Sequence, residues 1–281
     1  MITYPASAKG TQTRVLQGGL QGQVVLFLHG LSARADRWSC NLDAVGAAGY
    51  RALAIDLPGH GFAAKGADFD YSARGYSIWL ENFVASLDVR RVVLVGTSFG
   101  GLVAASFAAD FPERVAGLMA VGAIGLVPAG LERREKTVAW LKQMGRDQIR
   151  ERMRRGVSDP SLITEERVEE DWRINNSAGA AEAFAALGRY YKESIDDDAA
   201  AARVGALARR FPTRLVWGES DVSVSSDYGL EAQRLIPGSR LDFVAGCGHF
   251  PYWESPSEFN QLLLQFLHEC APVPSALKEA P

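Results

Sequence analysis

Residues 96–101, Gly-Thr-Ser-Phe-Gly-Gly, constrain what this chain can fold into more than any other stretch. They follow the apolar run 92–95 and precede the alanine-rich segment 102–109. β-Branched apolar residues favour a short buried strand, and alanines favour a helix. A serine at the tip of such a strand–turn–helix unit has a strained backbone and an exposed hydroxyl, and the flanking glycines avoid backbone collisions. The stretch therefore predicts that Ser98 is a nucleophile.

The composition is that of a globular protein. With 281 residues, of which 47% are hydrophobic, the chain can bury one large core. The net charge of −3, with scattered Lys and Arg, argues against nucleic-acid binding. We expect neither a signal peptide nor a membrane span, because no stretch has the required apolar length. The three widely spaced cysteines predict reduced thiols and a cytoplasmic protein.

Strand-like and helix-like segments alternate along the first half of the chain and return near its end. We predict helices at 43–49, 76–87, 102–109 and 259–267, and apolar strands at 23–28, 51–55, 92–95, 115–121, 214–217 and 240–244. Such alternation predicts an α/β fold with a mostly parallel central sheet and helices on both faces.

The segment 128–207 differs in character, because it is rich in Arg and Glu and contains no β-branched run. Trp140, Leu141 and Met144 have helical spacing there, and so do Val168, Trp172 and Asn175. We therefore predict a helical lid at 128–207, inserted into a core formed by 1–127 and 208–281. Its charged runs are expected to be solvated helix faces.

A serine needs a neighbouring base, and the chain has four histidines. His249 follows the last predicted strand, at the sheet edge where sites form in parallel sheets. His60 also follows a strand end and is the main rival, although it precedes Ser98 in the chain. His268 is expected in the last turn of a helix, which favours a cation but not an active site.

The base in turn needs a carboxylate to orient it. Asp221 follows the penultimate predicted strand, and the interval to His249 leaves room for one helix and one strand. Glu219 and Asp227 are the alternatives. The resulting chain order, Ser, Asp, His, is that of the α/β-hydrolases.

The chain resembles the α/β-hydrolase family over nearly its whole length. The resemblance is carried by five motifs, Leu-His-Gly at 28–30, Asp-Leu-Pro-Gly-His-Gly at 56–61, the nucleophile stretch at 96–101, Gly-Glu-Ser-Asp at 218–221 and Cys-Gly-His at 247–249. It implies an oxyanion hole formed by the backbone amides of Leu31 and Phe99. The Phe99 amide also opens a helix, whose positive end favours an oxyanion. His29, Asp56 and His60 are then expected to be structural.

The expected chemistry is acyl transfer through an acyl-enzyme, without a metal or another cofactor. The expected partner is a small ester or ketone substrate, with no nucleic acid and no membrane; a homodimer is an open alternative. The predicted substrate-binding side chains come from the lid and from the loops near the site, and they are Trp38, Trp140, Trp172, Phe250 and Trp253.

Within the family, the chain is most similar to meta-cleavage-product hydrolases, which split carbon–carbon bonds in diketo acids. The similarity lies in residues 161–166 before Trp172 and in residues 253–260. Three features depart from that group. Thr97 replaces an expected Asn, residues 31–34 replace a Gly-Pro-Gly loop, and Asp171 stands where an arginine is expected to bind the substrate carboxylate.

A carboxylate at Asp171 would repel an anionic diketo acid. The sequence therefore favours a carboxylesterase-like serine hydrolase acting on an ester or lactone of small to medium, partly apolar structure. Hydrolysis of a carbon–carbon bond in aromatic degradation is the alternative. A small-ligand receptor on the same fold is the third interpretation.

Overall fold

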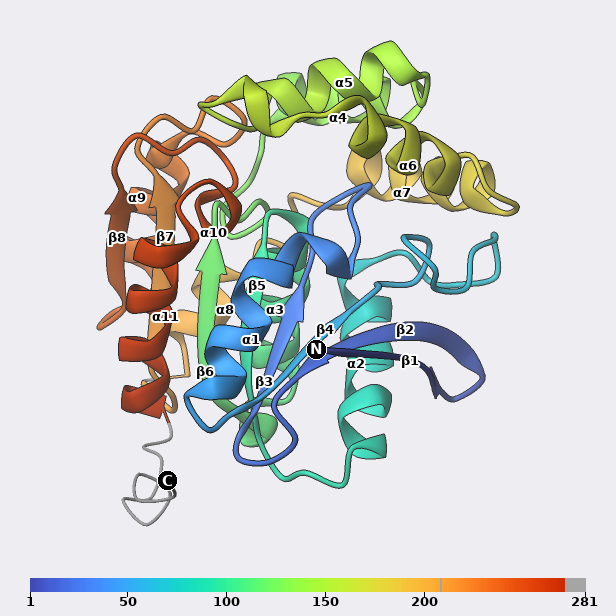
Figure 1. The fold of residues 1–281 in the computed structure, drawn as a ribbon. Coiled ribbons are helices and arrows are strands. Elements are labelled where there is room, and N and C mark those ends of the chain that lie inside the picture. Colours follow the sequence, from blue (N-terminus) through green and yellow to red (C-terminus); the bar gives the residue numbers. More distant parts are fainter. Residues whose placement is uncertain (208, 271–281) are drawn as a thin grey trace.

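A computed structural model describes residues 1–207 and 209–270. Within these residues, one sheet of eight strands runs in the order β1-β2-β4-β3-β5-β6-β7-β8. Strand β2 is antiparallel to both of its neighbours, and all pairs from β4 to β8 are parallel (Figure 1). The strands are β1 Ile2–Ala8, β2 Thr11–Gly18, β3 Val24–Leu28, β4 Arg51–Ile55, β5 Val92–Thr97, β6 Val115–Val121, β7 Thr213–Gly218 and β8 Arg240–Val244.

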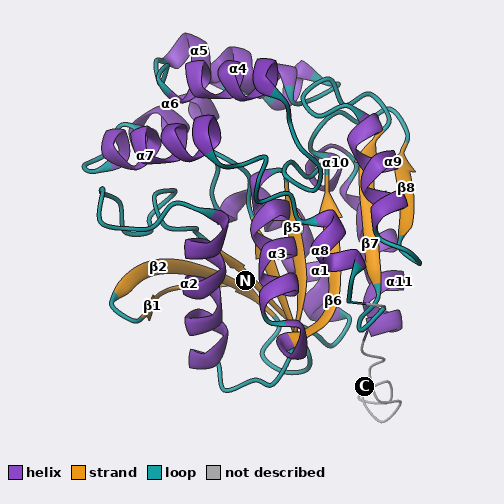
Figure 2. Ribbon diagram, turned by 180° about the vertical axis from the view of Figure 1, so that it is seen from behind, coloured by secondary structure: helices purple, strands orange, loops and turns teal. Residues whose placement is uncertain are grey.

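Helices cover both faces of this sheet. One face carries α1 (Ser39–Ala47) and α11 (Pro256–Cys270), with η1 (Ala35–Trp38) and α10 (Pro251–Glu254) beside them. The opposite face, turned forward in Figure 2, carries α2 (Ala73–Ser86), α3 (Phe99–Asp110), α8 (Ala201–Gly205) and α9 (Ser226–Leu235). The family fold predicted from the sequence is confirmed.

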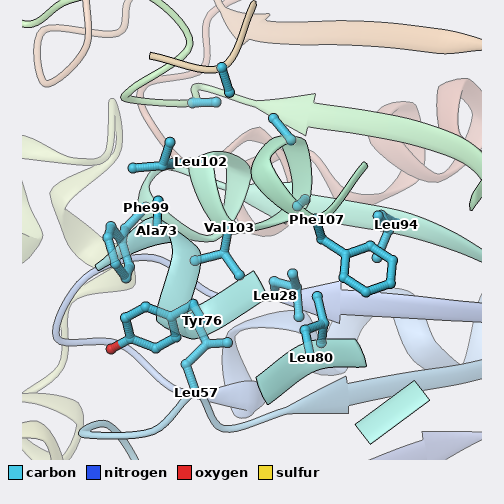
Figure 3. Packing of buried hydrophobic residues seen from close by; sticks show 14 of the residues in the cluster. Leu28, Leu57, Ala73, Tyr76, Leu80, Leu94, Phe99, Leu102, Val103 and Phe107 are labelled. Carbon is cyan, nitrogen blue, oxygen red and sulfur yellow. The ribbon is translucent and has the colours of Figure 1, made fainter. Parts of the chain in front are cut away.

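Alternate residues of the central strands supply two hydrophobic cores, because successive side chains of a strand point to opposite faces. Leu28 and Leu94 belong to the larger core, which Figure 3 shows packed around Phe99, Val103 and Phe107 of α3. Residues such as Phe27 and Val95 belong to the core under α1 and α11. Because helices cover both faces of the sheet, nearly every residue of a central strand is buried, and the central strands appear in the sequence as continuous apolar runs.

The six predicted strands are present, and their ends differ from the prediction by at most two residues. The first two strands were not predicted. They form an antiparallel hairpin whose turn contains Lys9, at φ 45°, and Gly10. Strand β1 lies at the edge of the sheet and is mostly exposed, so it lacks the apolar run that marks the buried strands.

Four helices between β6 and β7 lie over the carboxyl ends of the strands, and we call them the helical layer (Figure 1). They are α4 Leu131–Leu141, α5 Arg146–Arg155, α6 Glu165–Asn175 and α7 Ala180–Glu193, with the short η3 (Pro160–Leu162) before α6. The segment 128–207 is mostly helical, as expected from its periodicity, but its last helix, α8, packs against α3 and α9 on the sheet face and not in the helical layer. The predicted core range 208–281 includes residues 208 and 271–281, which lie outside the described residues.

No helix in the described ranges is both long and apolar enough to cross a membrane. The three cysteines, Cys40, Cys247 and Cys270, are free thiols.

Two histidines lie buried at the carboxyl edge of the sheet. The rings of His29 and His60 are 5.3 Å apart, and neither side chain reaches solvent. His29 Nε2 accepts a hydrogen bond from the Leu57 amide at 2.9 Å. Burial lowers the pKa of His29 to about 4 and that of His60 to about 3. Both are therefore neutral structural groups at neutral pH.

We expect the free energy of unfolding to fall as the pH is lowered from 6.5 towards 4. Both histidines are neutral in the folded and unfolded states above this range. Within this range, the imidazoles bind protons in the unfolded chain but not in the folded protein. The free energy of unfolding therefore falls by on the order of 3 kcal/mol per histidine by about pH 4. Urea unfolding at several pH values measures the slope. His60→Asn keeps a donor for the Pro58 carbonyl and should flatten the slope; an unchanged slope would contradict the assignment.

Candidate active site

Ser98 occupies the turn between β5 and α3 with a strained backbone, at φ 51° and ψ −120°. Glycine is required on both sides of it. A Cβ on Gly96 would collide with the carbonyl of Gly100, and a Cβ on Gly100 would collide with that of Leu28. Close packing of β3, β5 and α3 therefore holds the serine at the tip of the strand, as the sequence predicted.

Asp221 and His249 meet in the loops that follow β7 and β8. His249 Nδ1 and Asp221 Oδ2 are 2.8 Å apart, and the Asp221 side chain is fully buried. The other carboxylate oxygen, Oδ1, accepts the amides of Ser223 and Val224, each at 2.8 Å. The carboxylate is thus fixed from both sides and leaves Nε2 of His249 free to face the cavity.

Gly122, which follows β6, lies directly behind this pair with φ 49°. A Cβ there would lie 3.0 Å from His249 Nδ1 and 3.2 Å from Asp221 Oδ2. Both the positive φ and the close approach exclude a side chain. Sequence reasoning missed this residue, although a glycine directly after a buried strand was its visible signal.

The alternatives for base and acid lie elsewhere. His60 is buried against Phe99 and Phe184 and does not line the cavity that contains Ser98. Glu219 and Asp227 are both exposed; Asp227 contacts Ser225, and Glu219 accepts the Gly246 amide at 3.4 Å. Neither is bonded to a histidine in the described part of the chain.

The backbone amides of Leu31 and Phe99 flank the serine. Phe99 is the first residue of α3, so its N–H has no partner within the helix. In the ranges 1–207 and 209–270, neither amide donates a hydrogen bond to another group. Two free donors beside a serine suit a developing oxyanion.

Ser98 and His249 line one cavity of about 150 Å³ between the sheet edge and the helical layer. Of the predicted substrate-binding residues, Trp140, Phe250 and Trp253 line this cavity. Trp38 does not, which corrects the prediction: its ring is fully buried and stacks on Tyr252 at 4.1 Å between centroids. Trp172 lies instead beside a second cavity within the helical layer, under the guanidinium of Arg146.

Four arginines line the cavity that contains Ser98, and sequence reasoning assigned the three from segment 128–207 to solvated helix faces. They are Arg37, Arg133, Arg134 and Arg152. Arg37 and Arg134 are paired with carboxylates. Among the described residues, Arg133 and Arg152 have no carboxylate in an ion pair: Arg133 donates to the Ser223 carbonyl, and Arg152 donates to the Gln143 carbonyl and Met144 Sδ. Burial lowers the pKa of Arg152, and the Asp171 carboxylate opposes this shift from a distance without forming an ion pair with it. Its helical spacing from the buried Ile149 was the signal that could have revealed its orientation.

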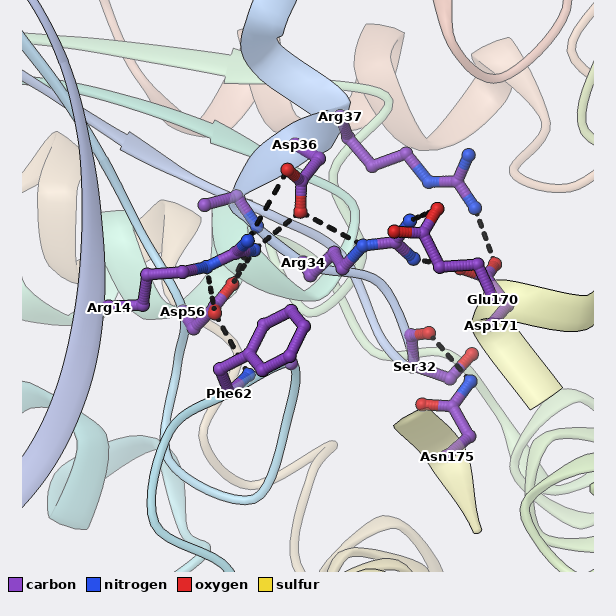
Figure 4. A network of polar contacts seen from close by, with 12 residues as sticks. Arg14, Ser32, Arg34, Asp36, Arg37, Asp56, Phe62, Glu170, Asp171 and Asn175 are labelled. Carbon is purple, nitrogen blue, oxygen red and sulfur yellow. Dashed lines mark hydrogen bonds and ion pairs between the residues drawn. The ribbon is translucent and has the colours of Figure 1, made fainter. Parts of the chain in front are cut away.

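Asp171 also lines the cavity, but its charge is already neutralised. The carboxylate pairs with Arg34, and with Arg37 at 2.5 Å (Figure 4). Arg34 also pairs with Glu170 and, at 2.9 Å, with Asp36. The repulsion of anions that the sequence predicted for Asp171 therefore does not apply, and the cavity is net positive.

The loop around His249 is fixed to the helical layer. The His249 amide donates to the Gly156 carbonyl at 2.8 Å. Glu254 accepts the Gly248 amide at 2.9 Å with one oxygen and the Ser158 amide at 2.6 Å with the other. The position of the imidazole thus depends on contacts with the end of α5.

Comparison with known proteins agrees with this geometry. The family described as "alpha/beta hydrolase fold" matches residues 23–256, which is most of the chain. The chain belongs to this family of hydrolases.

Individual relatives of this hydrolase come from more than one activity class. A 2-hydroxy-6-oxononadienedioate/2-hydroxy-6-oxononatrienedioate hydrolase of Klebsiella pneumoniae is 32% identical over 269 residues, covering 87% of each chain. A meta-cleavage product hydrolase structure from Pseudomonas fluorescens IP01 has a TM-score of 0.83 at 25% identity, covering 95% of this chain and 97% of that one. A membrane phospholipase A structure has a TM-score of 0.80 at 26% identity, covering 99% and 87%.

Replacing Asp221 by Asn in this hydrolase should lower kcat by about 10⁴-fold, because an amide no longer holds the imidazole in the tautomer that accepts a proton. Steady-state kinetics with any substrate that the wild type turns over measures the effect. Asp227→Asn, an exposed acid after the same strand, is the matched control and should retain activity. Wild-type activity in Asp221→Asn would exclude the assignment.

Proposed function

We propose that this hydrolase cleaves a carbon–carbon bond in an anionic diketo acid, with Ser98, His249 and Asp221 as its catalytic residues. The observation that carries the proposal is Arg152, a guanidinium in the cavity wall without a carboxylate partner in the described chain. An unpaired, half-buried cation of this kind binds an incoming carboxylate well. The names of the curated relatives support the same substrate class.

The sequence placed a neutral ester first because of Asp171. Arg34 and Arg37 neutralise the Asp171 carboxylate, so Asp171 does not count against an anionic substrate. Carbon–carbon bond hydrolysis, which the sequence analysis named as the alternative, is therefore the better supported activity.

The reaction would begin when His249 takes the Ser98 proton and Oγ adds to the ketone carbonyl. The Leu31 and Phe99 amides would stabilise the resulting oxyanion, each by roughly 3–4 kcal/mol. As the carbonyl re-forms, the bond to the neighbouring carbon breaks, and its electron pair enters the conjugated keto acid. His249 returns the proton to this fragment, and water then hydrolyses the acyl-Ser98 ester.

The leaving fragment explains the need for a cation. A carbon leaving group must delocalise its electron pair over a conjugated carbonyl system, whereas an alkoxide needs only a proton. A guanidinium at the carboxylate end of the fragment would orient the substrate along the cavity. We assign that role to Arg152, and we propose that the helical layer acts as the lid, with Trp140, Phe250 and Trp253 contacting the substrate.

An ester is the second candidate. Apolar side chains such as Leu31, Ile124 and Met153 line much of the same cavity. The membrane phospholipase A among the similar structures shows that the fold accommodates an ester hydrolase at this level of similarity. The same triad and oxyanion donors would serve both reactions.

A substrate panel tests the choice. We expect 2-hydroxy-6-oxononadienedioate to be hydrolysed with a higher kcat/KM than p-nitrophenyl acetate or butyrate, measured from the loss of the dienoate absorbance and from nitrophenolate release. Ser98→Ala should abolish both activities, and Ser106→Ala, a buried serine in α3 outside the cavity, is the matched control.

The opposite ranking would favour the ester hydrolase. Stoichiometric binding of the dienedioate by the wild type, without turnover of either class of substrate, would favour the receptor interpretation and overturn the proposal.

Arg152→Gln should lower kcat/KM for the dienedioate about 10- to 150-fold, because a hydrogen bond between charged groups contributes about 1.5–3 kcal/mol. Turnover of p-nitrophenyl acetate, which has no carboxylate, should change little. Arg154→Gln, an exposed arginine in the same helix, is the matched control. Equal losses for charged and neutral substrates would argue that Arg152 has only a structural role.

A further inference from the structure

The turn that carries the Leu31 amide has a costly backbone. Ser32, its next residue, has φ 54°, a left-handed value that favours glycine. The turn is closed by a hydrogen bond from the Ala33 amide to the Gly30 carbonyl at 3.2 Å. A serine in this position needs contacts outside the turn to keep one conformation.

Helix α6 supplies such a contact from the helical layer. Asn175, its last residue, donates from Nδ2 to the Ser32 carbonyl at 3.1 Å (Figure 4). The asparagine is only 4% exposed, so water competes little for this bond. No motif in the sequence links these two residues, which are 143 positions apart.

The bond reaches the Leu31 amide through two planar peptide groups. The Ser32 carbonyl and the Ala33 N–H belong to one peptide, and the Gly30 carbonyl and the Leu31 N–H belong to another. Because each peptide is rigid, the Ala33–Gly30 hydrogen bond transmits the orientation of the first plane to the second. Fixing the Ser32 carbonyl therefore fixes the direction in which the Leu31 N–H points.

A second contact from the same helix face holds the far side of the turn. Asp171 lies one helical turn before Asn175 and pairs with Arg34 and Arg37. Arg34 in turn pairs with Asp36, and the Ala35 amide donates to the buried Asp56 carboxylate at 2.8 Å. These charges fix α6 against the loop, so that Asn175 reaches the Ser32 carbonyl.

We propose that Asn175 and Asp171 are positioning residues that complete the oxyanion hole from the helical layer. The inference rests on the proposed serine-hydrolase chemistry, but not on whether the substrate is a diketo acid or an ester. Asn175 lines the same cavity as Ser98 and His249, but in the described residues its side chain is hydrogen-bonded to neither. It acts through the Leu31 amide, and the amide is aligned only when α6 is docked on the loop.

The test compares Asn175→Ala and Asn175→Asp with the wild type. Asp has the size of Asn, but its carboxylate cannot donate to a carbonyl, so it removes the bond without leaving a cavity. Asn176→Ala is the matched control, because Asn176 is exposed and, among the described residues, its side chain bonds to the Met144 and Trp172 carbonyls within the helical layer. Urea unfolding and circular dichroism verify that each variant is folded.

Four quantities separate positioning from a merely structural role. They are kcat and KM for whichever carbonyl substrate the wild type turns over, the inhibition constant of a trifluoromethyl ketone that forms an oxyanion with Ser98, and the dissociation constant of the substrate in a Ser98→Ala background. Both Asn175 variants should lower kcat at least about 10-fold, since loss of a whole donor costs about 10²–10³. The inhibition constant should rise by the same factor, and ground-state binding should change less than twofold.

The proposal would be overturned if the folded Asn175 variants had a kcat and an inhibition constant within twofold of those of Asn176→Ala. Equal weakening of inhibitor and ground-state binding would also overturn it, because that result indicates a general loss of the cavity. Failure of the proposed function is distinguishable, since a wild type that reacts neither with the ketone inhibitor nor with any substrate would refute the serine chemistry itself. A wild type that hydrolyses only esters would refute carbon–carbon cleavage and leave the Asn175 comparison intact.

Discussion

Parallel hydrogen bonding among β3, β5, β6 and β7 is the constraint on which the site depends. Because these strands run in the same direction and in register, their carboxyl ends lie along one edge. The residues that follow each strand therefore meet there, although they are far apart in the chain. Gly30, Ser98, Gly122 and Asp221 each follow a different strand, and His249 follows β8. No single loop builds the site: the strand ends bring its residues to one edge, and contacts with the end of α5 add to the placement of His249.

The sequence predicted the central sheet well, because strands that are buried on both faces must be apolar throughout. It also led to the Asp221–His249 pair, since strand ends of a parallel sheet share one edge. It did not reveal the first hairpin, whose edge strand has no apolar run. The prediction that Trp38 contacts the substrate was wrong, because its ring is buried. Closeness in sequence to a site loop does not show on which side of a short helix a side chain lies.

Charges were the least predictable part of the site. Spacing alone could not show that Asp171 is neutralised by Arg34 and Arg37, because these partners come from a loop more than a hundred residues away. In the arginine-rich helix α5, Arg150 is paired on the surface, whereas Arg152 lines the cavity. The sign of the field in the cavity is thus a tertiary property. It depends on which guanidinium groups remain without carboxylate partners after the helical layer has packed.

The backbone hydrogen bond from His249 to the Gly156 carbonyl ties the imidazole to the end of α5. A movement of α5 away from the strands would break this bond and remove one contact of the loop that holds the ring. The Asp221 carboxylate would still hold Nδ1, because the Ser223 and Val224 amides fix it within the loop after β7. The helical layer thus supports the base in addition to forming one wall of the cavity.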